Sequence, residues 1–242
     1  MIERSEPVTT RINQIIRERV KNGSYRPGAR LPSELELANE FGVSRSTLRN
    51  AINSLATEGV ILRKHGNGSY INQHAVQFNT QLQNLWSFPQ LIQESGRTPE
   101  IQYIHSFTRI STPDEEAILE LNSPQPVFIL QRRFLADGKP VIYSTNILPE
   151  DLFTQPKPCL DTQLSIYELM LAFCNIELVY SISDLHAEKI SDTVNKQLKI
   201  GLDRSILVFN DVFYTKESRP VVMGLNYYND QILALRLVRS KV

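Results

Sequence analysis

The chain has 242 residues, which is enough for two domains. Its 26 Lys and Arg residues balance its 26 Asp and Glu residues, so the overall charge gives no sign of a nucleic-acid partner. The charge is uneven, because residues 1–72 hold 11 basic and 7 acidic residues while the remainder holds 15 and 19. The N-terminus is polar and no apolar run could span a bilayer, so we expect a cytoplasmic protein with no membrane partner.

The sequence contains little that favours catalysis or metal binding. Its only cysteines are Cys159 and Cys174, which we expect to be free thiols in a reducing compartment. None of its four histidines has metal-ligand spacing with another histidine or a cysteine. Because there is also no nucleophile–base pair and no phosphate-binding glycine loop, we expect no metal, no cofactor and no catalytic residue.

Two amphipathic helices are predicted first, over residues 9–22 and from Ser33 onward. Apolar residues recur at helical spacing in the first, and Gly23 ends the pattern. In the second, Ser33 is a favourable N-cap, and Glu36 three residues later completes a capping box. Each helix therefore presents one apolar face to a shared core.

A third helix is predicted after a tight turn at Gly42, with Ser44 as its N-cap. Apolar residues mark its buried stripe, and polar or cationic residues lie on the remaining surface. The buried stripe is Leu48, Ala51, Ile52 and Leu55; the exposed residues are Arg45, Ser46, Arg49, Asn50 and Asn53. A polar, cationic face that begins at a helix N-terminus suits the bases and phosphates of DNA.

A small basic hairpin follows, with strands predicted at residues 61–64 and 69–72 around Gly66-Asn67-Gly68. Arg63, Lys64 and His65 precede its tip, where cations can reach phosphates or a narrow minor groove. Taken singly, each piece is also typical of an ordinary solvated surface. Their joint order is that of a winged helix-turn-helix, which favours duplex DNA as a partner.

Several segments of this region are distinctive: Leu31-Pro32-Ser33-Glu34, Phe41-Gly42-Val43-Ser44-Arg45, Thr47-Leu48-Arg49, residues 55–59 and the glycine tip. In them the chain resembles the GntR family of bacterial transcription regulators. Together with the helix-face argument, this resemblance gives the expected DNA contacts: Glu34, Ser44, Arg45, Ser46, Thr47, Arg49, Arg63, His65 and Gly66. Leu35 departs from the family, which often has arginine there. We expect Leu35 to be exposed, so the usual operator core is not assumed.

Residues 73–83 are polar and are predicted to link a DNA-binding domain, residues 1–72, to a second domain, residues 84–242. In the second domain, short helices are predicted at 86–94, 113–121, 165–173 and 191–200, and strands at 101–110, 127–136, 141–148, 206–214 and 221–228. Turn signals at Asp137-Gly138 and Glu217-Ser218 join two of the strand pairs. Strands with helices between them indicate an α+β fold with an antiparallel sheet.

Four segments of the second domain are similar to the UTRA domain: Trp86-Ser87-Phe88, residues 132–140, residues 146–149 and Ser165-Ile166-Tyr167-Glu168. That domain marks the HutC subfamily and has the chorismate-lyase fold. The resemblance implies a unit that binds a small effector and dimerises. Effectors in the subfamily include phosphorylated sugars, amino-acid derivatives such as urocanate, and phosphonates.

The resemblance also implies which residues bind an anionic effector, namely Ser87, Arg132, Ser165 and Tyr167. A guanidinium matches an anion in a planar, two-bonded geometry, and a serine at a helix N-terminus adds a hydroxyl and backbone N–H groups. We expect Tyr143, Ser144, Tyr227 and Tyr228 to line the same pocket. Simpler roles remain open: Ser165 as an N-cap only, Tyr167 and Tyr228 as core aromatics, and Arg132 in a surface ion pair.

Two positions depart from the sugar-phosphate-sensing members of the subfamily. Phe134 stands where a second arginine often lies, and Ser144 stands where such members have a glutamate. Arg133 does not replace the missing arginine, because neighbouring strand residues point to opposite faces of a sheet. An anionic effector is still expected, but not an amino-sugar phosphate.

The sequence as a whole predicts a ligand-responsive regulator of transcription that binds double-stranded DNA. We expect a homodimeric repressor on a palindromic operator, released by a small anionic or phosphorylated metabolite. An activator of the same family is the alternative. A chorismate-lyase-like enzyme is a further alternative, for which the chain offers no catalytic residues.

Overall fold

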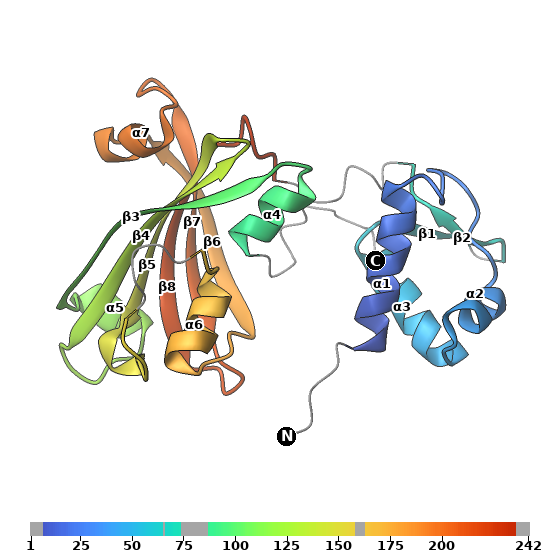
Figure 1. Cartoon of the computed structure of the whole chain (residues 1–242), viewed down its shortest axis with the longest axis horizontal. Coiled ribbons are helices and arrows are strands. Elements are labelled where there is room, and N and C mark those ends of the chain that lie inside the picture. The colour runs from blue at the N-terminus through green and yellow to red at the C-terminus, as the bar shows by residue number, and fades with distance from the viewer. Residues whose placement is uncertain (1–6, 65, 74–86, 158–162, 236–242) are drawn as a thin grey trace. The chain divides into compact units, whose positions relative to one another are not determined.

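The computed structural model describes residues 7–64, 66–73, 87–157 and 163–235. They form two compact units, one reaching Gln73 and the other running from Ser87 to Leu235 (Figure 1). Apart from Gln73, the predicted linker lies outside the described residues. In the ranges that are described, no helix has the length and apolar character needed to cross a membrane.

The first unit contains three helices and a two-stranded hairpin. Its elements are α1 (Val8–Lys21), α2 (Glu34–Phe41), α3 (Arg45–Thr57), β1 (Ile61–Lys64) and β2 (Gly68–Ile71). Helix α3 packs against both α1 and α2, and Ile16, Leu48 and Leu55 are fully buried where they meet. The predicted order of helices and hairpin is confirmed, with the second strand beginning one residue earlier than expected.

Side-chain caps fix the helix boundaries in this unit. Ser33 and Glu36 form the predicted capping box, in which Ser33 Oγ accepts from the Glu36 N–H at 3.2 Å and Glu36 Oε2 accepts from the Ser33 N–H at 2.7 Å. Gly42 ends α2 with φ of 64°, a left-handed conformation that glycine adopts without steric cost. Ser44 then caps α3 by accepting from the Thr47 N–H at 3.1 Å.

The second unit is built on one antiparallel sheet of six strands in the order β3-β4-β5-β8-β7-β6. The strands are β3 (Pro99–Ile110), β4 (Pro126–Ala136), β5 (Lys139–Pro149), β6 (Tyr180–Lys189), β7 (Ser205–Tyr214) and β8 (Pro220–Tyr228). The helices are α4 (Phe88–Glu94), α5 (Pro113–Ile118), α6 (Ile166–Cys174), α7 (Asp192–Leu198) and a 3-10 turn, η2 (Glu150–Leu152). The predicted α+β fold with an antiparallel sheet is therefore confirmed.

The sheet has helices on both faces. On one face, α6 packs its buried side chains, including Leu169 and Met170, against Phe128, Leu148 and Phe213 of the strands (Figure 1). On the other face, Val194 and Leu198 of α7 pack against Tyr143 and Val208. Cys174 at the end of α6 is a buried free thiol, as predicted, whereas Cys159 lies outside the described residues.

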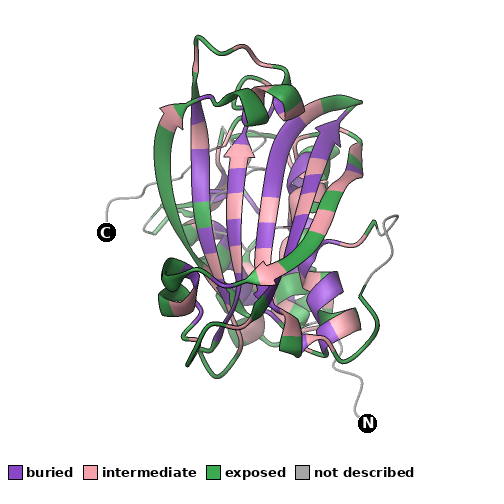
Figure 2. Cartoon of the chain, turned by 90° about the vertical axis from the view of Figure 1, so that its left-hand side faces the viewer, coloured by how far each residue is buried: buried purple, intermediate pink, exposed green. Residues whose placement is uncertain are grey.

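Strand β6 was not predicted from the sequence. Its burial follows no two-residue alternation, because it is one of the two edge strands and nearly all of its residues are exposed (Figure 2). The inner strands, in contrast, are largely buried. Ile182 and Leu185 are 55% and 48% exposed on β6, which leaves apolar side chains along this edge of the sheet.

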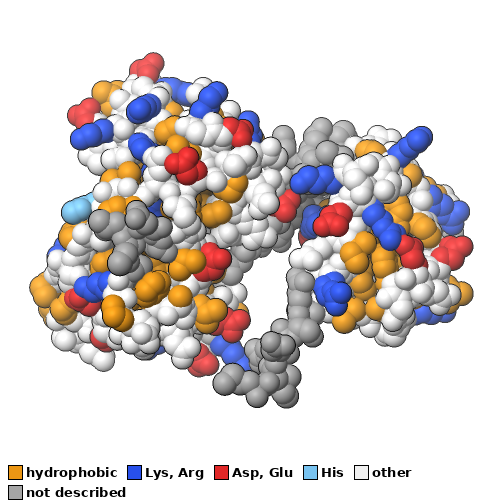
Figure 3. Space-filling view, in the orientation of Figure 1, with side chains coloured by type: hydrophobic (Ala, Val, Ile, Leu, Met, Phe, Trp, Pro, Cys, Tyr) orange, Lys and Arg blue, Asp and Glu red, His pale blue; other side chains and the backbone are white. Residues whose placement is uncertain are grey.

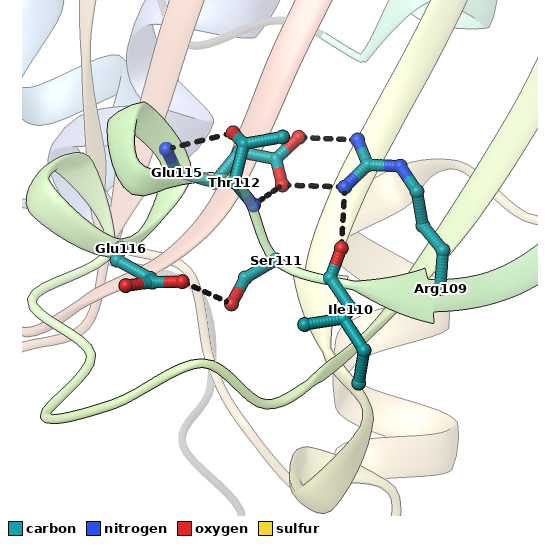
Figure 4. A network of polar contacts seen from close by, with 6 residues as sticks. All are labelled: Arg109, Ile110, Ser111, Thr112, Glu115 and Glu116. Atoms are coloured by element: carbon teal, nitrogen blue, oxygen red, sulfur yellow. Dashed lines mark hydrogen bonds and ion pairs between the residues drawn. The ribbon is translucent and has the colours of Figure 1, made fainter.

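A polar network joins the end of β3 to α5 (Figure 4). Arg109 donates to both carboxylate oxygens of Glu115, at 2.7 and 2.5 Å, and to the carbonyl oxygen of Ile110 at 3.0 Å. Thr112 caps α5, and Glu115 accepts from its N–H at 2.9 Å. The Arg109 guanidinium lowers the pKa of the buried Glu115 carboxyl, which therefore stays ionised. The resulting ion pair connects the end of β3 to α5.

Candidate DNA-binding face and effector site

The expected DNA contacts lie at the start of α2, the start of α3 and the hairpin. Arg45, Ser46 and Arg49 are exposed on α3, and Gly66 adopts φ of 71° at the hairpin tip. The Ser44 hydroxyl is hydrogen-bonded to those of Ser46 and Thr47, at 2.8 Å each. His65 lies outside the described residues. Leu35 is 51% exposed, as predicted.

Glu34 connects the two cationic elements of this face. Its carboxylate accepts from Arg49 of α3 at 3.0 and 3.1 Å and from Arg63 of β1 at 3.1 Å. All three side chains are partly exposed, so the pairs contribute little to stability. Their effect is geometric, because one carboxylate holds an arginine of the third helix and an arginine of the wing in a fixed relation.

Arg30 was not predicted from the sequence as part of this face. It forms a bridge with Tyr70 of β2, and its guanidinium lies against Gly68, where an added Cβ would meet Arg30 Nε at 3.2 Å. A hollow of about 490 Å³ lies between Arg30, the start of α2 and the hairpin. On the face drawn in Figure 3, the first unit at the right shows Lys and Arg side chains interspersed with acidic and apolar ones.

In the second unit, Arg132 lies on β4 and is only 2% exposed. Its Nη1 donates to the carbonyl oxygen of Leu164 at 2.6 Å, and its Nη2 donates to Asn146 Oδ1 at 3.1 Å. No carboxylate of the described residues pairs with it, so the alternative of a surface ion pair is wrong. Burial lowers the pKa of Arg132 to about 10, which leaves it charged at neutral pH.

Three buried polar atoms beside one another have no hydrogen-bond partner among the described residues. They are Arg132 Nε, Ser144 Oγ and Asn226 Oδ1. Strand pairing places Arg132 opposite Ser144 and Ser144 opposite Asn226, so the three side chains form one row across β4, β5 and β8. Native proteins rarely leave buried polar groups unpaired, so this row of three atoms is a candidate binding site.

Aromatic side chains lie next to this row. The Phe88 ring contacts the rings of Phe134 and Tyr228, with centroids 4.9 and 5.8 Å apart. The Arg132 guanidinium lies 5.4 Å from the Phe134 ring centroid, so the residue that departs from the subfamily pattern contacts the buried cation. Tyr228 is buried and Tyr167 is partly buried, and burial raises the pKa of both phenols.

Ser87 and Ser165 are both helix N-caps. Ser87 Oγ accepts from the Gln90 N–H at 3.3 Å, and Ser165 forms a capping box with Glu168. The N-cap role left open for Ser165 is therefore confirmed. Leu164 precedes Ser165 and accepts from Arg132, so the N-terminus of α6 lies at Arg132. Phe88 follows Ser87 and contacts Phe134, an aromatic neighbour of Arg132.

Tyr143 does not join this group. It is a neighbour of Ser144 on β5, and successive strand residues point to opposite faces of a sheet. The structure places Tyr143 in the core beneath α7, stacked with Tyr227 at 6.1 Å between ring centroids. The expectation that Tyr143 and Tyr227 share a pocket with Ser144 is corrected for that reason. Arg133 also faces this side, where it donates to the Gln197 carbonyl oxygen at 3.2 Å.

Asp211 was missed by the sequence analysis. It lies on β7, is 7% exposed, and accepts hydrogen bonds from Ser183 and from Asn226 Nδ2, the latter at 2.6 Å. Burial raises the pKa of Asp211 to about 6, although both hydrogen bonds act in the opposite direction. The available signal was a charged residue between Phe209 and Phe213, at an inward position of a strand.

Two family matches cover most of the chain. Residues 8–71 match the bacterial regulatory proteins of the gntR family, and residues 94–232 match the UTRA domain. Over 222 residues the chain is 24% identical to the HTH-type transcriptional regulator YurK of Bacillus subtilis (strain 168), covering 91% of this chain and 90% of YurK. It is 32% identical over 146 residues to the HTH-type transcriptional repressor NagR of the same strain, covering 60% and 59% of the two chains.

The fold is also shared with solved structures. The crystal structure of YydK from Bacillus subtilis matches with a TM-score of 0.75 at 16% identity, covering 97% of this chain and 99% of that one. A gntR-family match on the winged helix-turn-helix, followed by a UTRA match on the antiparallel unit, places the chain in the class of DNA-binding transcription regulators. The chain belongs to the GntR family of bacterial transcription regulators, among the members that carry a UTRA domain. Because these families and relatives are regulators, the alternative of a lyase is set aside.

The substitution Asp211→Asn tests the cost of the buried charge. The folded-state pKa of about 6 exceeds the ordinary value, so ionisation of Asp211 lowers the free energy of unfolding as the pH rises toward and beyond 6. Removing the charge should raise that free energy by roughly 1–3 kcal/mol at about pH 8 and change it little near pH 4. Urea unfolding at the two pH values measures the difference.

The exposed Asp184 of β6 supplies the matched control, because Asp184→Asn removes a charge that is already solvated. An Asp211→Asn variant that is destabilised equally at both pH values would show that the carboxylate is needed for its hydrogen bonds and carries no burial cost.

Proposed function

We propose that this regulator is a homodimeric repressor that binds a palindromic operator and is released by a small anionic effector. The observation that carries the effector assignment is Arg132, a buried cation with no counter-ion among the described residues, beside Ser144 and Asn226 with unpaired polar atoms. An anion bound there would accept a hydrogen bond from Arg132 Nε–H and would act as the counter-ion of the guanidinium. Phosphorylated and carboxylate metabolites are the candidate effectors.

The DNA-binding part of the proposal rests on the exposed N-terminus of α3 and the hairpin. Arg45 and Arg49 lie on α3, and Arg63 lies on the hairpin, where Glu34 orders two of these three guanidiniums. Such a face suits base edges for α3 and phosphates for the wing. The names of NagR and of the histidine utilization repressor of Pseudomonas putida, which is 39% identical over 71 residues, favour repression over activation.

Two copies of the chain are needed for strong and specific binding. Residues 1–72 have a net charge of only +4, so one module would make few phosphate contacts, and a dimer would double them. The outer strand β6 offers a surface for the second copy, since it exposes the apolar side chains Tyr180, Ile182 and Leu185 beside unpaired backbone groups. A two-fold dimer then reads a two-fold operator.

Release requires that the effector prefers the arrangement of the dimer that does not bind DNA. A near-complete switch needs a difference in binding free energy of about 5.5 kcal/mol between the two arrangements. An effector that contacts Arg132 in only one of the two arrangements would supply such a difference.

Arg49→Ala should weaken operator binding by about 1–3 kcal/mol if its guanidinium contacts a guanine edge. The operator is first obtained by selecting genomic fragments on the full-length protein, and affinity is then measured by gel shift at fixed salt. Arg11→Ala removes an exposed cation from α1 and is the control for charge alone. Equal affinities for the wild type and the Arg49 variant would exclude Arg49 from recognition.

Ile182→Glu should raise the dimer dissociation constant by about tenfold or more, because it places a charge in the proposed apolar contact. Sedimentation velocity over a concentration series measures this constant. Leu202→Glu changes an equally exposed apolar residue outside β6 and should leave it unaltered. A wild-type protein that is monomeric throughout the series would refute the homodimer.

Arg132→Met should abolish stabilisation by anionic effectors, since it removes the cation but keeps an apolar side chain of similar length. A thermal-shift panel of inorganic phosphate, sugar phosphates, phosphonates and carboxylates would first identify a ligand. At 100 times its Kd, that ligand should stabilise the wild type by about 2.7 kcal/mol. Arg133→Met, on the opposite face of the same strand, should keep the response. A shift that survives in Arg132→Met would place the effector elsewhere.

A further inference from the structure

The effector site has a second charged group that the anion-binding proposal does not use. Asp211 is buried, and its hydrogen-bond partners, Ser183 and Asn226, are both neutral. No ion pair joins Asp211 to a cation in the part of the chain that the structure describes. The site therefore holds one buried cation and one buried anion, each without a counter-charge.

The two charges lie on the same face of the sheet. Asp211 is opposite Gly224 of β8, and Gly224 is opposite Asn146 of β5, the residue that accepts from Arg132. Asn226 donates to Asp211 and lies opposite Ser144 of β5. Ser144 in turn lies opposite Arg132 of β4. Side chains from β4 and β7 thus reach inward over the two central strands without forming a pair with each other.

The glycine at position 224 makes this arrangement possible. A Cβ at that position would lie 3.0 Å from Asn226 Nδ2 and 3.4 Å from the Asp211 Cβ. The φ of Gly224 is not in the left-handed region, so backbone conformation does not require glycine there. A side chain there would instead crowd the Asn226 amide, which donates to the Asp211 carboxylate.

The fixed Asn226 amide makes one end of the site an acceptor end. Because Nδ2 donates to the carboxylate, Oδ1 is left as an unpaired acceptor beside it. The Tyr167 and Tyr228 phenols are close enough to Asp211 that its charge contributes to raising the pKa of each. The Arg132 end, in contrast, presents an unpaired N–H donor.

We propose that Asp211 binds a protonated amine of the effector while Arg132 binds its anionic group, so that the effector is a small zwitterion. This inference rests on the proposed effector site at Arg132. A ligand of both signs supplies each buried charge with its counter-charge, and neither charge remains buried and unpaired. A ligand with the anion alone would leave Asp211 uncompensated.

Matched probes test this proposal on the full-length protein by isothermal titration calorimetry. The zwitterions are ω-aminoalkyl phosphates and ω-amino carboxylates of increasing chain length, and each is compared with the alkyl phosphate or carboxylate that lacks the amine. In the wild type, at least one zwitterion should bind roughly tenfold or more tightly than its amine-free partner, because its amine supplies a counter-charge to a carboxylate that is already buried. Equal affinities in every pair would overturn the zwitterion and leave the anion site standing.

Variants separate this inference from the function on which it rests. Asp211→Asn should remove the advantage of the amine while keeping the affinity for the amine-free anion, which also reports that the variant is folded. Asp184→Asn on β6 should keep the advantage. An advantage that persists in Asp211→Asn would overturn the role of Asp211. If no probe binds, or if binding of both probe types survives Arg132→Met, the anion site itself is wrong and the zwitterion with it.

Discussion

The second unit depends on how the buried Arg132 guanidinium is held, since no carboxylate in the described ranges pairs with it. Arg132 is fixed by the Leu164 carbonyl oxygen and by the side chain of Asn146, two dipoles that stabilise its charge only in part. Leu164 directly precedes the N-cap of α6, so the same contact ties the helix to the sheet. Any group that neutralises Arg132 therefore acts on the joint between α6 and β4, which is where a ligand signal can enter the fold.

The serines of the sensor unit illustrate how one residue serves both structure and recognition. Ser87 and Ser165 each accept a backbone N–H of the helix that they begin, and this use is independent of any ligand. The resemblance to the UTRA domain also connects them with anion binding. The two roles are compatible, because a helix N-terminus keeps further N–H groups free for an anion after the cap is formed.

The sequence contained enough to predict the first unit almost completely, because caps and apolar periodicity act within single helices. Ser33, Gly42 and Ser44 stand at the boundaries that their chemistry predicts. Strand β6 could not be predicted, because an outer strand exposed on both faces carries no alternating pattern. The inward position of Asp211 could be read from its strand, but its place and that of Asn226 on the same face as Arg132 depend on strand register, which is set by partners far away in the chain.

The rule of alternation could have corrected one error in advance. The rule places Arg133 and Arg132 on opposite faces of the sheet. It places Tyr143 and Ser144 on opposite faces in the same way, so these two residues cannot line one pocket.

Glu34 has a consequence for how the protein searches a genome. Its carboxylate already occupies Arg49 and Arg63, so DNA must compete with an internal partner for both guanidiniums. Random sequence offers only phosphates in exchange, whereas an operator adds base edges that match the freed groups. Displacing the internal partner costs the same in both kinds of complex, so it lowers the affinity for operator and for random DNA alike. The ratio between the two, which decides occupancy among many competing sites, is then left to the base edges that match the freed guanidiniums.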